Sequence, residues 1–200
     1  GGGDGGMARE VLRHKSVEHV TMVELDRSVV DMCIEHLPSL SNGAFEDPRL
    51  DLLFADGSTF VEQTDERWDV IIIDSTDPIG PGEVLFRESF YKACKRCLTD
   101  GGILLPQNGV PFVQGEEVTN SFNRLSPYFA DVWFYTAAVP TYQGGAMAFG
   151  WASDDKSLRQ LPVPEIAARF KVADIHCRYY TPEAHAAAFG LPQFIRKLLV

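Results

Sequence analysis

The stretch RWDVIIIDSTDPIGP, residues 67–81, carries the clearest indication of the fold. Its apolar run at 70–73 is continuous, which is typical of a strand buried on both faces within a parallel sheet. The run ends at one carboxylate, Asp74, and a second, Asp77, follows three positions later. The two prolines after Asp77 restrict the backbone, so we expect a loop held in one shape.

The segments on either side alternate between helical and strand patterns, which predicts an α/β fold with a mostly parallel sheet. Helices are expected at 7–15, 27–40, 57–64, 86–99 and 114–129, and strands at 17–25, 49–56, 67–74, 102–108, 131–142 and 145–153. The helix at 86–99 is expected to close on the glycines that follow Asp100. The last two strands are expected to pair antiparallel at the sheet edge, before a mostly helical tail at 164–200. We interpret residues 1–200 as a single domain.

The composition excludes several classes of protein. A net charge of −10 disfavours nucleic acid and anionic membranes as partners and is compatible with a cationic ligand. No signal peptide and no membrane-spanning apolar run is evident, so the four cysteines predict a reduced, cytoplasmic protein. The CxxC at 94–97 has no second pair and no nearby His, which disfavours a zinc site.

The glycine-rich start GGGDGG fits a nucleotide-binding turn. Gly1, Gly3 and Gly6 match G-x-G-x-x-G, and Glu24 ends the next predicted strand about 20 residues on, as a ribose-binding carboxylate should. NAD(P) and S-adenosyl ligands both remain open on this pattern. Asp4 either caps the helix that follows or repels anionic ligand groups and attracts an ammonium. The second reading favours a nucleoside with an amine at its tail.

Asp56 and Gly57 follow the next predicted strand. An aspartate there can accept a hydrogen bond from an adenine amine while the glycine keeps the backbone clear. A helix N-cap is an equally good interpretation of Asp56 alone.

The pair Asp74 and Asp77 permits three kinds of chemistry: metal binding, acid–base work on a sugar, or recognition and deprotonation of an amine. No further carboxylate or His stands nearby, which weakens the metal reading. A glycosidase would not need the nucleotide turn. Two carboxylates at the two ends of one substrate would suit a diamine, although a capping role for both stays open.

These motifs together resemble the spermidine synthase family, the putrescine aminopropyltransferases. The resemblance runs in order along nearly the whole chain and rests on GGGDGG, TMVELD, ADG, DSTDPIGPGEVLF, CLTDGGILLPQNG and PTYQGGAMAFGWAS. It implies a Rossmann-like fold of the S-adenosylmethionine-dependent methyltransferase type. It also implies transfer of the aminopropyl group of decarboxylated S-adenosylmethionine to putrescine, with that nucleoside as co-substrate and with neither a prosthetic group nor a metal.

The resemblance also assigns roles to residues. On the nucleoside side these are Gly1 and Gly3 in the turn, Glu24 at the ribose, Asp56 and Gly57 at the adenine, Asp4 at the aminopropyl amine, and Pro81 at the methylthioadenosine pocket. On the acceptor side, Asp74 matches the proton acceptor and Asp77 the carboxylate that holds the diamine. Gln107 and Tyr142 match polar residues beside the diamine, although each has a packing role as an alternative.

Three points stay open at this level. The family carries a small β-rich domain and a first strand ahead of the glycine turn, and their absence here predicts a sheet without a central strand. A polyamine N-methyltransferase, a nucleoside-binding fragment without turnover and, more distantly, an NAD dehydrogenase remain alternatives. The acceptor amine is undetermined, and the resemblance implies a homodimer or homotetramer.

Overall fold

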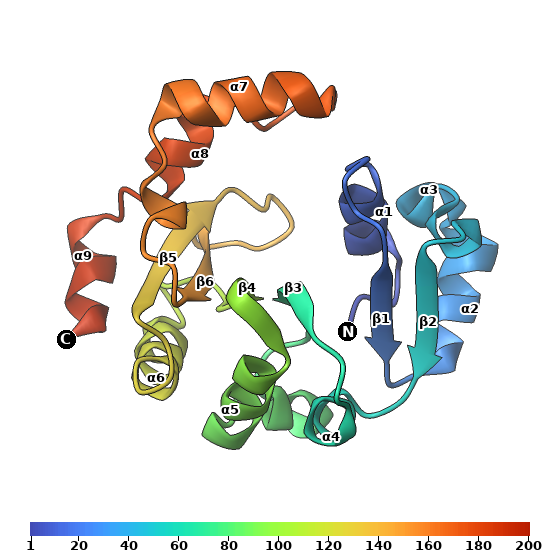
Figure 1. Cartoon of the computed structure of the whole chain (residues 1–200). Helices are drawn as coiled ribbons and strands as arrows, with labels where there is room; N and C mark the ends of the chain where they lie inside the picture. The colour runs from blue at the N-terminus through green and yellow to red at the C-terminus, as the bar shows by residue number, and fades with distance from the viewer.

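The computed structural model describes all residues, Gly1–Val200, as an α/β fold (Figure 1). The strands are β1 Val20–Glu24, β2 Leu50–Phe54, β3 Trp68–Ile73, β4 Leu98–Pro106, β5 Asp131–Ala137 and β6 Met147–Ser153. The α-helices are α1 Gly6–Leu12, α2 Arg27–His36, α3 Pro38–Ser41, α4 Gly57–Gln63, α5 Glu88–Arg96, α6 Gly115–Leu125, α7 Val163–Ala173, α8 Pro182–Ala188 and α9 Gln193–Arg196. Four 3₁₀ turns complete the chain: η1 Ala44–Glu46, η2 Gly80–Phe86, η3 Leu158–Gln160 and η4 Lys197–Leu199. None of these helices combines the length and the apolar composition that a membrane-spanning helix needs.

The strands form two separately hydrogen-bonded sheets. β1 and β2 pair in parallel, and the other four run in the order β3-β4-β6-β5. β3 and β4 are parallel, whereas β6 is antiparallel to both β4 and β5, which confirms the predicted antiparallel edge. No strand pairs with both β1 and β3, and the chain's first residues lie between them (Figure 1). The expected parallel sheet is therefore divided between these two strands.

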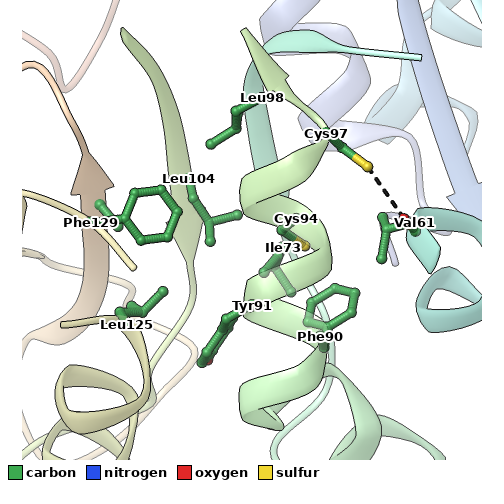
Figure 2. Packing of buried hydrophobic residues seen from close by; sticks show 11 residues of the cluster. Val61, Ile73, Phe90, Tyr91, Cys94, Cys97, Leu98, Leu104, Leu125 and Phe129 are labelled. Atoms are coloured by element: carbon green, nitrogen blue, oxygen red, sulfur yellow. Dashed lines mark hydrogen bonds between the residues drawn. The ribbon is translucent and has the colours of Figure 1, made fainter. Parts of the chain in front are cut away.

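The main hydrophobic core lies between the larger sheet and the helices α4, α5 and α6. Figure 2 shows Ile73 and Leu104 from β3 and β4 facing one side of α5. Both thiols of the CxxC sequence, Cys94 and Cys97, are buried here, and Cys97 Sγ donates to the carbonyl oxygen of Val61 at 3.3 Å. Burial raises the pKa of the Cys97 thiol, so this pair packs as neutral apolar side chains.

The end of α5 differs from the sequence prediction. The helix ends at Arg96, and β4 begins two residues later with the buried Leu98. The glycines after Asp100 therefore lie inside the strand. Gly101 has a φ of +74°, at the place where the β3–β4 register shifts, so this glycine serves a bulge and not a helix cap.

The C-terminal helices cover the β5–β6 edge. Phe189, which follows α8, packs edge-on against Trp151, and its carbonyl oxygen accepts a hydrogen bond from Trp133 Nε1 at 3.1 Å. Ile195 of α9 and Val118 of α6 belong to a second buried cluster on this side. The tail confirms the helical expectation.

Candidate active site

Four of the predicted site residues lie at the carboxyl ends of strands or within two residues of them. Glu24 is the last residue of β1, Asp56 lies two residues after β2, Asp74 follows β3, and Gln107 follows β4. In parallel α/β folds ligands bind at this edge. The topology thus gathers side chains that lie more than eighty residues apart in the sequence.

The glycine turn lies between β1 and β3. The backbone nitrogen of Gly1 donates to the carbonyl oxygen of Val23 at 3.0 Å, and a Cβ at Gly1 would lie 2.1 Å from the carbonyl oxygen of Asp74. A Cβ at Gly3 would lie 3.3 Å from Glu24 Oε2. Only glycine allows so close an approach at the first position. The turn therefore brings the ends of these two strands together and places Glu24 at its side.

Asp4 and Asp74 lie close enough for their charges to interact. Asp4 Oδ1 accepts a hydrogen bond from the backbone nitrogen of Gly6 at 2.7 Å. One of its two carboxylate oxygens therefore has the capping role that the sequence allowed. The pKa of Asp74 is raised, first by partial burial and then by the negative charge of Asp4. Asp74 stays accessible to solvent and accepts no hydrogen bond from another side chain. Its carboxylate is a stronger proton acceptor than an ordinary aspartate.

The adenine-side residues lie at the start of α4. Asp56 Oδ1 accepts from the backbone nitrogen of Thr59 at 2.8 Å, so its side chain caps this helix. A Cβ at Gly57 would contact Leu85 at 3.6 Å, which shows how closely α4 approaches η2. Pro81, the second residue of η2, is exposed. A concavity of about 360 Å³ runs along α4, and Asp56 is the only predicted site residue that lines it.

Asp77 differs from Asp74 because its carboxylate is fixed. Asp77 Oδ2 accepts a hydrogen bond from Gln114 Nε2 at 2.9 Å, and the same nitrogen donates to Glu117 Oε1 at 3.1 Å. The sequence reasoning missed Gln114 and Glu117. The available signal was the polar run QGEE, which begins α6 soon after the predicted strand that precedes it.

Gln107 is buried and forms its hydrogen bonds to the protein backbone. Its Nε2 donates to the carbonyl oxygen of Ser75 at 3.1 Å, and its Oε1 accepts from the nitrogen of Gly109 at 3.2 Å. It thereby ties the loop after Asp74 to the end of β4. Tyr142 lies in the loop between β5 and β6, where it is 55% exposed. Its phenol forms no hydrogen bond to the other site residues, so the structure does not join it to them.

The fold is an α/β fold of the methyltransferase type, and carboxylates surround its glycine turn. These two features define a class of proteins that bind an S-adenosyl-type nucleoside beside a cationic group. The family description "spermine/spermidine synthase domain" matches residues 1–161. The chain belongs to this family. Groups of three or more His, Cys, Asp or Glu side chains that would hold a metal ion are absent from the structure.

Similar proteins agree with this membership. Polyamine aminopropyltransferase 1 of Pseudomonas aeruginosa is 60% identical over 98% of this chain and 68% of its own length. The polyamine aminopropyltransferase of Shigella sonnei is 54% identical over the whole chain and 69% of its own length. A crystal structure of spermidine synthase with the transition-state analogue AdoDATO superposes with a TM-score of 0.92 at 35% identity, covering 100% of this chain and 67% of that one.

Proposed function

We propose that this protein transfers the aminopropyl group of decarboxylated S-adenosylmethionine to putrescine, giving spermidine and methylthioadenosine. The observation that carries the proposal is the Asp74 carboxylate, whose pKa is raised beside Asp4 at the strand ends. The names of the similar proteins, aminopropyltransferases and spermidine synthases, support the same reaction. The chain is accordingly a transferase of an alkyl group other than methyl.

The donor nucleoside lies beside the glycine turn in this proposal. Gly1 and Gly3 leave room for it, Glu24 accepts from the ribose hydroxyls, and Asp56 with Gly57 borders the adenine. Asp4 uses the oxygen that is free of the Gly6 hydrogen bond to hold the aminopropyl ammonium. Pro81 lines the methylthioadenosine side.

The chemical step is a displacement at the methylene carbon bonded to the sulfonium. One acceptor ammonium first loses a proton to Asp74, and the neutral nitrogen then forms the new carbon–nitrogen bond as the carbon–sulfur bond breaks. The electron pair of the broken bond stays on sulfur, so the leaving group is a neutral thioether. Because the electrophile already carries a positive charge, the protein's work is to position the amine and accept its proton.

The acceptor lies between the two loop carboxylates in this scheme. Asp77 holds the ammonium that does not react, at a distance from Asp74 set by the loop between them. Gln107 supports this loop through its hydrogen bond to the carbonyl oxygen of Ser75. We also propose that Gln107 and Tyr142 contact the diamine directly. The proposal further includes a single domain, a homodimer or homotetramer, and no nucleic-acid partner.

A polyamine N-methyltransferase is the alternative enzyme, and Asp4 argues against it. The carboxylate of S-adenosylmethionine would meet this aspartate, whereas the decarboxylated co-substrate offers only its ammonium. A cytoplasmic location fits the four free cysteines, which are typical of a reducing compartment.

The experiment that tests the function supplies putrescine with each co-substrate in turn and identifies the product by mass. Spermidine formed only with decarboxylated S-adenosylmethionine is the expected result. A methylated amine formed with S-adenosylmethionine would replace the proposal by the alternative. Binding of methylthioadenosine without any product would leave a nucleoside-binding protein. A panel of diamines under the same conditions then fixes the acceptor.

A further inference from the structure

The side chain of Gln114, immediately before α6, uses all of its polar atoms inside the site. Its Nε2 group donates one hydrogen bond to Asp77 and a second to Glu117, and its Oε1 accepts from the backbone nitrogen of Val110 at 3.0 Å. Because a backbone N–H can only donate, the contact with Val110 fixes which end of the amide is the oxygen. The nitrogen must then face the two carboxylates.

The space around this amide is filled. Gly109 has a φ of +60°, and a Cβ there would lie 2.7 Å from Gln114 Oε1 and 2.9 Å from Glu117 Oε2. The segment that follows β4 therefore packs directly against the amide and the second carboxylate. Gln114 cannot swing away from Asp77 without losing three hydrogen bonds in a crowded environment.

Asp77 and Glu117 would repel each other without the amide between them. The pKa of Glu117 is raised, first by burial and then by the negative charge of Asp77, while its hydrogen bond from Gln114 opposes both effects. Glu117 Oε2 is buried and has no hydrogen-bond partner. One amide thus stabilises two neighbouring carboxylates by donating to both.

We propose that Gln114 is the positioning residue of the acceptor: it fixes the Asp77 carboxylate and separates it from Glu117, and thereby sets the affinity for the diamine. The inference rests on the proposed function, in which Asp77 holds the distal ammonium. Gln114 contacts neither the glycine turn nor Asp74 through any hydrogen bond. Its effect should consequently be confined to the acceptor.

The test compares Gln114→Leu with the wild-type protein in steady-state kinetics. We expect the KM for putrescine to rise about 10-fold, the scale of one lost hydrogen bond to a charged group. The KM for decarboxylated S-adenosylmethionine should change less than about 2-fold, and kcat at saturating putrescine less than about 3-fold, because the reacting atoms are untouched. Gln160→Leu, an exposed glutamine in η3, is the matched control and should leave all three constants unchanged.

Glu117→Gln separates positioning from simple charge attraction. The new side-chain carbonyl oxygen still accepts from Gln114, so the putrescine KM should stay within about 3-fold of wild type. If this variant raises the KM as much as Gln114→Leu does, the charge of Glu117 holds the amine directly and the positioning role is overturned. An unchanged putrescine KM in Gln114→Leu, or an equal change in both KM values and kcat, would also overturn it.

A failure of the proposed function can be distinguished from a failure of the positioning role. If the wild-type protein forms no spermidine, titration calorimetry with putrescine and methylthioadenosine replaces the assay. Weaker putrescine binding by Gln114→Leu than by wild type then supports the positioning role even without turnover. Equal binding, or no putrescine binding by the wild-type protein, overturns it.

Discussion

Asp74 and Asp77 lie three residues apart in one loop, yet their surroundings differ. Asp74 accepts no hydrogen bond from another side chain, and burial together with the charge of Asp4 raises its pKa. Asp77 accepts a hydrogen bond from Gln114, and its loop is tied to β4 through Gln107. A proton acceptor must change its charge during turnover, whereas a holder of a permanent ammonium must keep its charge and its direction. The two environments match these two tasks.

The largest effect that tests this difference is expected from Asp74→Asn. The variant keeps the shape of the side chain but cannot accept a proton, so we expect kcat to fall by about 10² or more. Turnover of putrescine with decarboxylated S-adenosylmethionine measures it. Asp100→Asn, at an exposed position in β4, is the control and should keep full activity. Near-normal turnover of Asp74→Asn would remove Asp74 from the role of base.

The corresponding change at the second carboxylate should act on binding. Asp77→Asn loses the charge that holds the ammonium, and its new amide nitrogen can face the donating nitrogen of Gln114. We expect the KM for putrescine to rise by about 10-fold or more, with a much smaller change in kcat. A fall in kcat as large as that of Asp74→Asn would contradict the division of tasks between the two residues.

Asp4→Asn sharpens the electrostatic side of the comparison. The negative charge of Asp4 is one cause of the raised pKa of Asp74, so removing it should lower that pKa. Asp74 would then stay ionised to lower pH, and the acid limb of the kcat/KM profile for putrescine should move to lower pH. The profile of Asp77→Asn, measured in parallel, should keep its acid limb. An unmoved limb in Asp4→Asn would show that the two carboxylates are not coupled.

The smallest effect is expected at Asp56, where the structure shows a helix cap. Asp56→Ala should lower the free energy of unfolding by about 1 kcal/mol because the hydrogen bond to Thr59 is lost. Asp56→Ser, which keeps a capping oxygen, should preserve most of that stability while removing the carboxylate. Chemical denaturation measures stability, and calorimetry with methylthioadenosine measures binding. Weakened binding in both variants supports an adenine contact, and normal binding in Asp56→Ser leaves only the cap.

Much of the arrangement was predictable from local sequence. The continuous apolar run before Asp74 predicted a strand buried on both faces. The structure has the strand β3 there, but Val70 is 46% and Ile72 is 36% exposed, so the two-sided burial was wrong. The turn GGGDGG and Glu24 were predicted to bind one nucleoside, and in the structure a Cβ at Gly3 would lie 3.3 Å from the Glu24 carboxylate. Strand ends could be located because a change from apolar residues to Asp or Gly is a local signal.

Other features were beyond local sequence. The glycines after Asp100 were predicted to cap the preceding helix. A helix cap and a β-bulge both favour glycine, and the bulge can be recognised only from the pairing of β4 with β3. Gln114 was overlooked because the polar run QGEE does not by itself indicate which carboxylate its glutamine contacts. Its role appears only where α6 meets the loop of Asp77, 37 residues away in sequence.

The sequence alone determined the elements, the carboxylates at the strand ends and the family these motifs resemble, because each depends on neighbouring residues or on an ordered set of motifs. The tertiary structure decided which carboxylate is free and which is fixed. That distinction depends on a side chain delivered by another element, on burial and on the distance between charges. Those quantities exist only once β1, β3, β4 and α6 are packed together.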